Sequence, residues 1–246
     1  MQAGTRCAIF NLGISFFDIV CDHLPQVAVR LGGLLDEHVL RDLAGAPGRV
    51  ARLARDAEAL ADPELQLLLG VVAAFYALGP AEGEHSGLAE QLVSAHRAQM
   101  LSVGRADVSS DLALAAAREK STLPFAMIGV IAAGGRPDAD IASSLAERVG
   151  VAFWLADDLA DAAVDFDNGA LNALLVDAYE GFGPGAYPHA GPGPLGRILE
   201  DGTIERTAET VGARLGEAVE LANAAGGDAG SRLGEVLVCA MRDWLA

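Results

Sequence analysis

Residues 153–167 read FWLADDLADAAVDFD, and this segment places Asp157, Asp161 and Asp165 directly behind an aromatic and apolar run. On an α-helix, a step of four residues rotates by only ~40° and rises by ~6 Å, so the three carboxylates share one stripe. Carboxylates that lie ~6 Å apart repel by roughly 3 kcal/mol at an effective dielectric constant near 20. Such a stripe is tolerated either in full contact with solvent or around a shared cation. The segment therefore predicts a helix with an apolar side in the core and an acidic side that faces water or a metal.

The helical spacing of this segment continues through most of the chain. Apolar residues recur at intervals of three and four, and alternating β-branched runs are nearly absent, so we predict an all-α protein. The chain has 246 residues, of which 52% are hydrophobic, and we expect residues 1–246 to form a single-domain helical bundle. Helices are expected over residues 7–24, 26–44, 48–60, 63–78, 86–104, 107–118, 120–134, 138–166, 170–180, 203–224 and 229–245. The segment GFGPGAYPHAGPGPLG at 181–196 is expected to be a loop, either a mobile surface loop or a lid over an active site.

The charge of the chain restricts its partners. The net charge is -17 and the isoelectric point is about 4.5, which argues against binding to nucleic acid or to an anionic membrane surface. The apolar runs are shorter than the ~20 residues that a membrane-spanning helix needs. Cys7, Cys21 and Cys239 show no CxxC spacing. We therefore expect reduced thiols and a cytoplasmic protein.

A second acidic pair supports the cation interpretation of the first. Asp18 and Asp22 are four residues apart in ISFFDIVCDHLP, again after an apolar aromatic run. Ligands that are all oxygen atoms suit Mg²⁺, which keeps several waters and binds one or two carboxylates together with phosphate oxygens. If the two acidic segments face each other across a bundle, they form a mouth that holds Mg²⁺ and binds a diphosphate.

Lys120 is the third element, and it is the single lysine of the chain. It precedes the apolar run STLPFAMIGVIAA, so we expect it at the start of a helix, where the helix N-terminus also favours anions. A surface lysine near a helix start is the alternative interpretation.

Taken in order, these stretches resemble the polyprenyl synthetase group of the class I isoprenoid synthases. In that family a Lys-Thr pair begins a helix, and a Gly-x-x-Phe-Gln segment then leads into a DDxxD motif. The counterparts here are Lys120-Ser121, the stretch from Gly150 to Phe153, and DDLAD at 157–161. DIVCD at 18–22 resembles the earlier aspartate-rich motif of the family, with Ile19 in place of its second aspartate. The resemblance extends over residues 8–176 and is clearest over 119–165.

The resemblance implies a bundle of the isoprenoid synthase type with a central apolar cavity. Three Mg²⁺ ions would grip a prenyl diphosphate substrate and promote its ionisation, and the residues that match the family's motifs would supply the site. The implied catalytic and metal ligands are Asp18, Asp22, Asp157 and Asp161, with Asp165 extending the metal set. The implied diphosphate contacts are Lys120 and Arg242, although a surface role is the alternative for Arg242. The substrate pocket would be lined by Phe16, Phe17, Phe125, Phe153 and Trp154, unless these side chains belong to the core.

The differences from the family pattern restrict which reaction class is expected. Chain-elongating members bind a second diphosphate through an early Gly-Lys-Arg segment and an Arg-Arg pair after the first motif, whereas HLPQVAVRLGG follows Asp22 here. We therefore expect a class I terpene synthase (cyclase), a Mg²⁺-dependent lyase that acts on one allylic diphosphate. Two alternatives stay open: a trans-prenyl diphosphate synthase, and a non-catalytic helical subunit that regulates a full-length synthase. By analogy with the family we also expect a homodimer.

Overall fold

The computed structural model describes residues 3–34, 36–44, 52, 55–56, 61–67, 69–70, 88–104, 110–133, 139–168, 171–180 and 193–225. Helices account for nearly all of this part of the chain, and it contains no strand, so the predicted all-α class is confirmed for it. The helices with defined bounds are α1 (Ala3–His23), α2 (Pro25–Leu34), α3 (Glu37–Ala44), α6 (Leu88–Gly104), α7 (Ser110–Ala133), α8 (Ala139–Asn168), α9 (Ala173–Glu180), α10 (Gly193–Glu200) and α11 (Thr203–Ala224).

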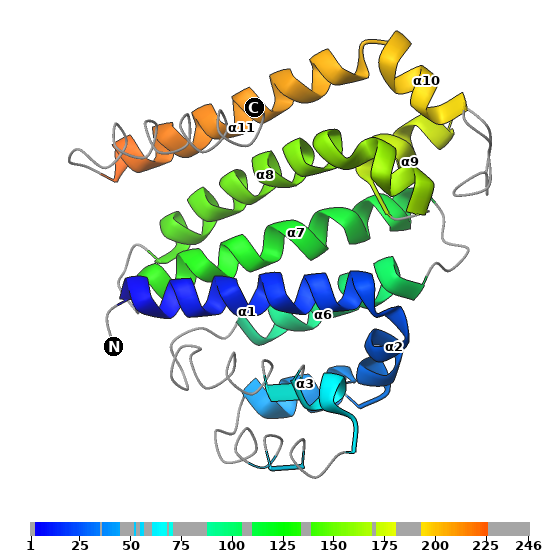
Figure 1. Cartoon of the computed structure of the whole chain (residues 1–246). Helices are drawn as coiled ribbons and strands as arrows, with labels where there is room; N and C mark the ends of the chain where they lie inside the picture. Colours follow the sequence, from blue (N-terminus) through cyan, green and yellow to red (C-terminus); the bar gives the residue numbers. More distant parts are fainter. Residues whose placement is uncertain are drawn as a thin grey trace.

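Helices α7 and α8 form the centre of the bundle and run in opposite directions (Figure 1). Helices α1 and α6 pack on α7, whereas α11 packs on α8. Helix α7 therefore lies between α1 and α8. Because α1 and α8 run in the same direction, their C-terminal ends lie at the same end of the bundle, the end that carries α9 (Figure 1).

Two glycines allow the close approach of α7 and α8. A Cβ added at Gly129 would lie 2.3 Å from the carbonyl oxygen of Ala142, and one added at Gly150 would lie 2.8 Å from Cβ of Phe125. Both distances are shorter than real Cβ contacts, so a side chain at either position would push the two helices apart.

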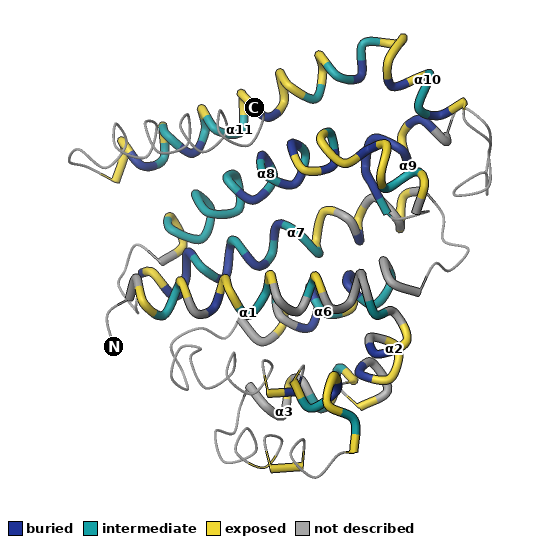
Figure 2. The backbone as a smooth tube through the Cα atoms, in the orientation of Figure 1, coloured by how far each residue is buried: buried dark blue, intermediate teal, exposed yellow. Residues whose placement is uncertain are grey.

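The core lies along the facing sides of the central helices (Figure 2). One cluster joins Trp154 of α8 to Leu174 and Leu175 of α9 and Ile198 of α10. A second cluster joins Phe10 of α1 to Met127 and Ile131 of α7, with Ala95 of α6 at its edge. The first cluster attaches the α9–α10 segment to α8, and the second attaches the N-terminal helix to α7 and α6.

Helix α7 corrects one prediction from the sequence. Residues 110–133 form one helix, whereas separate helices were expected over 107–118 and 120–134. Lys120 therefore lies in the interior of α7, and the expected contribution of a helix N-terminus at this residue is wrong. Pro124 was compatible with either arrangement, because a proline inside a helix removes one hydrogen bond, here to the carbonyl of Lys120, without always ending the helix.

Helix α10 corrects the expected loop at 181–196. Residues 193–196 are its first turn, and Pro194 is compatible with that position because the first N–H groups of a helix have no partner within it. Residues 181–192, which carry the rest of the expected loop, lie outside the described residues. The same holds for most of the expected helix 48–60 and for all of the expected helix 229–245.

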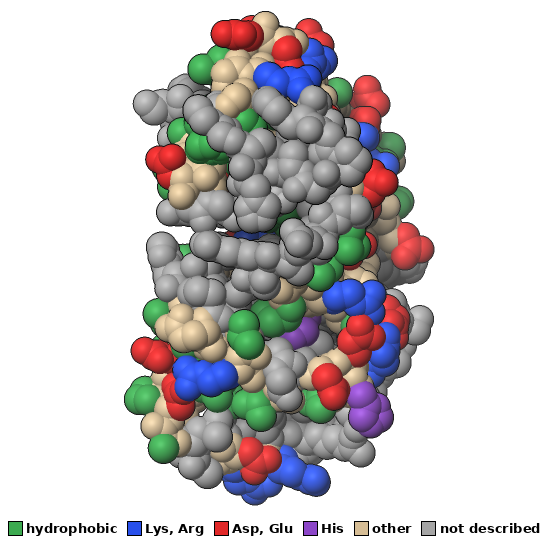
Figure 3. All heavy atoms as spheres, turned by 90° about the vertical axis from the view of Figure 1, so that its right-hand side faces the viewer, with side chains coloured by type: hydrophobic (Ala, Val, Ile, Leu, Met, Phe, Trp, Pro, Cys, Tyr) green, Lys and Arg blue, Asp and Glu red, His purple; other side chains and the backbone are tan. Residues whose placement is uncertain are grey.

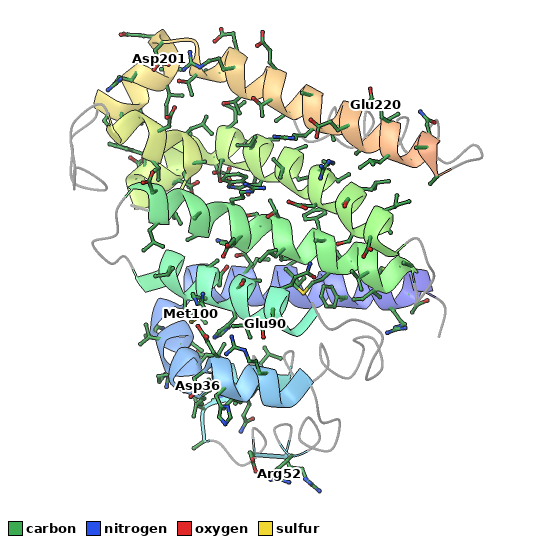
Figure 4. The ribbon with its side chains drawn as sticks, turned by 180° about the vertical axis from the view of Figure 1, so that it is seen from behind. Asp36, Arg52, Glu90, Met100, Asp201 and Glu220 are labelled. Carbon is green, nitrogen blue, oxygen red and sulfur yellow. The ribbon has the colours of Figure 1, made fainter. Side chains whose placement is uncertain are left out.

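Ion pairs attach α3 to α6 on the side of the bundle away from α8 (Figure 4). Arg41 Nε lies 2.9 Å from Glu90 Oε1, and Arg97 pairs with Glu37. Asp36 accepts a hydrogen bond from the Val39 N–H at 2.8 Å and so caps the start of α3. On the face shown in Figure 3, positive and negative side chains lie next to one another. As predicted, no helix in the described ranges is long and apolar enough to cross a membrane.

Candidate functional site

An ion pair between α1 and α7 brings two of the predicted site residues together. The Lys120 ammonium nitrogen lies 3.0 Å from Oδ1 of Asp18, and both side chains are partly accessible to solvent. That oxygen is itself shielded from solvent and accepts no hydrogen bond from the described residues. A shielded carboxylate oxygen without a hydrogen bond is unfavourable, and the Lys120 ammonium compensates the charge of this one.

The acidic ladder of α8 faces this ion pair. Asp157 keeps contact with solvent, but partial burial of its carboxyl group raises its pKa to about 6. Repulsion from Asp161 adds to this rise, as do the charges of Asp18 on α1 and of Asp165, and the Lys120 ammonium opposes it. The pKa of Asp157 thus responds to charges on three helices, and Lys120 on the intervening α7 carries the opposing positive charge.

Asp165 is the last carboxylate of the ladder and is only partly exposed. Burial raises its pKa, a hydrogen bond from Asn172 lowers it, repulsion from Asp161 raises it, and the charge of Lys120 lowers it. Two steps of ~40° along a helix place Asp165 ~80° away from Asp157 around the axis of α8. The ladder therefore curls from the α7 side of the helix towards α9.

Asp158 has a role that the sequence did not indicate. Its side chain is buried, and its Oδ2 accepts a hydrogen bond at 2.7 Å from the N–H of Ala173, the first residue of α9. Burial raises its pKa to about 7, although the bond from Ala173 lowers it. Adjacent residues on a helix point ~100° apart, so Asp158 faces α9 while Asp157 faces solvent and α7.

Asn172 completes the connection between α8 and α9 and was also absent from the predicted site. Its side chain is fully buried, with 0% exposure. Its Oδ1 accepts hydrogen bonds from the N–H groups of Leu174 and Leu175, as an N-cap residue does. Its Nδ2 donates to the Asp158 carbonyl and to Asp165 Oδ2. An asparagine directly before the apolar run ALLV is a signal for a helix start that the sequence did offer.

The charges around Lys120 fit an additional cation. Its ammonium affects the pKa values of Asp157, Asp158 and Asp165 and pairs with Asp18, so one positive charge is surrounded by several carboxyl groups. Within the described residues, no three His, Cys, Asp or Glu side chains are grouped closely enough to hold a metal alone. Mg²⁺ uses one or two carboxylates together with phosphate oxygens and water. Oxygen-only donors of this kind suit Mg²⁺ better than softer metals.

Two of the predicted pocket aromatics form a pair next to this cluster. The rings of Phe125 on α7 and Phe153 on α8 stack with their centroids 5.8 Å apart. Phe153 precedes Asp157 by four residues and therefore lies one helical turn from it, on a similar side of α8. Trp154 instead packs in the apolar cluster with α9 and α10, which is a core position.

The remaining predicted residues are not placed at the level of side chains. The C-terminal half of α1 carries Asp22, Phe16 and Phe17, as it carries Asp18. The side chains of these three residues lie outside the description. Arg242 falls outside the described residues altogether. The apolar cavity stays a prediction.

Comparisons with protein-family models, with curated proteins and with solved structures found no match for this chain. The functional interpretation therefore depends on the chemistry of the residues described above.

Proposed function

We propose that this chain is a class I terpene synthase, which ionises one allylic prenyl diphosphate with the help of Mg²⁺. The observation that carries the proposal is the position of Lys120 on α7, paired with Asp18 of α1 and within electrostatic reach of Asp157 on α8. Three segments that are distant in the sequence contribute to one charged cluster. The resemblance to the isoprenoid synthases concerned these same residues.

The carboxylates would serve as the protein's share of the metal ligands. Asp18 and Asp157 approach from opposite sides of α7, and their mutual repulsion favours a cation between them. Burial is the main cause of the raised pKa of Asp157, and repulsion from Asp161 and Asp18 adds to it, so binding of a cation would lower this pKa again. Bound Mg²⁺ would supply Lewis-acid stabilisation of the departing diphosphate. Asp161 and Asp165 continue the same acidic stripe towards α9.

Lys120 would bind the diphosphate directly. Its side chain is mostly buried but not closed off from solvent, with 21% exposure, so its ammonium can exchange the contact with Asp18 for a phosphate oxygen. A fixed positive charge near the leaving group stabilises the negative charge that develops there. An ion pair with Asp18 before binding would hold the lysine in place and limit the reorganisation that the reaction requires.

The stacked pair Phe125 and Phe153 would protect the allylic cation. Phe153 lies one turn before Asp157 along α8 and stacks on Phe125, so a hydrocarbon chain that extends from the ladder towards the start of α8 would meet these rings. Aromatic faces stabilise a desolvated cation by about 2 kcal/mol and keep water away from it.

Product analysis tests the proposal. The full chain is incubated with C10, C15 and C20 allylic diphosphates, with and without Mg²⁺ and with and without the C5 homoallylic diphosphate. We expect a hydrocarbon or alcohol from a single substrate, formed only with Mg²⁺. Longer diphosphates that require the C5 unit would instead establish chain elongation. No turnover, together with no Mg²⁺-dependent thermal shift by inorganic diphosphate, would refute the enzyme assignment and favour a regulatory subunit.

Matched variants connect the activity to the cluster. Asp157→Asn removes a charge from the ladder, whereas Asp167→Asn removes an exposed charge from the same helix ten residues later. We expect turnover to fall at least about 100-fold in the first variant and to stay within twofold of the wild type in the second. Equal effects of the two substitutions would show that the α8 ladder is not the site.

A further inference from the structure

Asn172 uses every hydrogen-bonding group of its side chain. Two N–H groups of α9 point at its Oδ1, from Leu174 at 3.0 Å and from Leu175 at 3.3 Å. Its Nδ2 donates to the Asp158 carbonyl at 2.7 Å and to Asp165 Oδ2 at 2.8 Å. An amide has two acceptor sites and two donor hydrogens, so all four are occupied. The partners also determine which end of the amide is the oxygen.

The two halves of this side chain serve different purposes. Capping α9 requires only the oxygen, and serine or aspartate would supply it equally well. The NH₂ group is not needed for the cap, yet it reaches back to α8 and holds one oxygen of Asp165. Its second bond adds a donor to the Asp158 carbonyl, which lies inside α8 and is already placed to accept the usual bond of a helix.

The bond to Asp165 fixes a carboxylate that the helix alone would leave free to rotate. Asp165 lies ~20° from Asp158 around the axis of α8, because seven residues make almost two turns. It is therefore the ladder residue nearest to α9, and Asn172 at the start of α9 is the group that reaches it. Because the amide is neutral, it orients the carboxylate without cancelling its charge. With Oδ2 held by Asn172, the direction of the other oxygen of Asp165, Oδ1, is fixed as well.

We propose that Asn172 is a positioning residue, which orients Asp165 through its Nδ2 and thereby strengthens the binding of a divalent cation and diphosphate at the acidic ladder. This inference rests on the proposed function, since it assigns Asp165 to the metal-binding set. Groups that hydrogen-bond to metal ligands commonly change metal affinity by 10- to 100-fold when they are replaced. Asn172 is such a group, because it donates a hydrogen bond to Asp165, and its bonds to the N–H groups of α9 hold its side chain in one orientation.

The test separates the cap from the positioning bond. Asn172→Ser keeps an oxygen that can cap α9 but is too short to reach Asp165 from the same backbone position. Asp36→Ser is the matched control, because Asp36 caps α3 through the Val39 N–H on another part of the bundle. For each full-length variant, Mg²⁺ is titrated at fixed inorganic diphosphate, and the thermal shift gives the half-saturating Mg²⁺ concentration. Amide hydrogen exchange at Leu174 and Leu175 reports whether the cap persists.

We expect Asn172→Ser to raise the half-saturating Mg²⁺ concentration about tenfold, with the amides of α9 still protected and Asp36→Ser unchanged. In an Asp165→Asn background, Asn172→Ser should add less than a twofold effect, because its target is gone. The inference is overturned if Asn172→Ser binds like the wild type, or if it weakens binding equally with and without Asp165. If the wild type itself shows no Mg²⁺-dependent shift, the proposed function fails, and this role of Asn172 fails with it.

Discussion

Asp158→Asn should make the stability of the protein less dependent on pH. In the folded protein, burial raises the pKa of Asp158 from 3.8 to about 7. Between these two values the folded chain holds a proton on Asp158 that the unfolded chain has released. The contribution of this carboxyl group to stability is therefore fully present below pH 3.8 and is lost as the pH rises towards 7. Asparagine cannot ionise and does not incur this loss.

The magnitude follows from the interval between the two pKa values. Each pH unit within it changes the free energy of unfolding by about 1.4 kcal/mol, and the change levels off near the folded pKa. Between pH 5 and pH 8, the wild type should therefore lose about 2 to 3 kcal/mol relative to Asp158→Asn. Asparagine also keeps an oxygen that can accept the Ala173 N–H, so the cap of α9 is retained in part.

Urea unfolding monitored by circular dichroism measures this difference. Both proteins are unfolded at half-unit steps from pH 5 to pH 8 in the presence of a chelator, so that no divalent cation lowers the carboxyl pKa values. Asp157 and Asp165 are present in both proteins, so the difference between the two curves reports Asp158 together with its repulsion from these two neighbours. The exposed substitution Asp167→Asn should run parallel to the wild type. If the Asp158→Asn curve also runs parallel, within about 0.5 kcal/mol, Asp158 does not hold a proton in the folded state at neutral pH.

Three further predictions concern the lysine, the helix crossing and the cap. Lys120→Met should reduce Mg²⁺-dependent turnover by at least about 100-fold, whereas Arg118→Met, two residues earlier on the exposed side of α7, should leave turnover within twofold; equal losses would place the lysine outside the site. Gly150→Ala should lower the free energy of unfolding by about 1 to 3 kcal/mol, since its Cβ would lie 2.8 Å from a phenylalanine Cβ. Gly212→Ala in α11, where nothing lies within 4 Å, should instead raise it by up to about 1 kcal/mol, and urea unfolding compares the two. Asn172→Ala should destabilise by about 1 to 3 kcal/mol more than Asn172→Ser, because it leaves buried N–H groups of α9 without an acceptor; a difference below 0.5 kcal/mol in the same assay would contradict the cap.

The sequence predicted the helical class and the course of α8 because both follow from local spacing. Apolar residues three and four apart specify a helix whatever lies around it, and the ladder 157–165 needed only the pitch of that helix. The position of Lys120 depended instead on whether the chain breaks before it. Proline inside a helix is costly but tolerated where packing on both sides is strong, and α7 is packed between α1 and α8. That compensation comes from tertiary packing, so local sequence patterns carry no sign of it.

The role of Asp158 could not be predicted from the sequence either, because it also depends on tertiary packing. Two adjacent aspartates look alike in the sequence, and only the docking of α9 decides which of them turns inward. Trp154 was ambiguous in a similar way. It lies four residues before Asp158 and faces the same side of α8, where it packs against Leu174 and Leu175. A pocket role and a core role for this residue differ only in what covers that side of the helix.

The two adjacent aspartates Asp157 and Asp158 therefore have two different roles, because neighbouring residues of a helix point in different directions. Neighbouring residues point ~100° apart on a helix, so the two carboxylates of this pair face different surroundings. Here the Asp158 carboxylate accepts a hydrogen bond from the first N–H of α9, and Asn172, the N-cap residue before α9, donates one to Asp165. Asp158 thus holds the start of α9 in place, and Asn172 at that point orients Asp165. A substitution at Asp158 that removes its bond to α9 should consequently disturb Asp165 before it disturbs Asp157. Among the described hydrogen bonds, those that join α8 to α9 involve Asp158 and Asp165 and not Asp157.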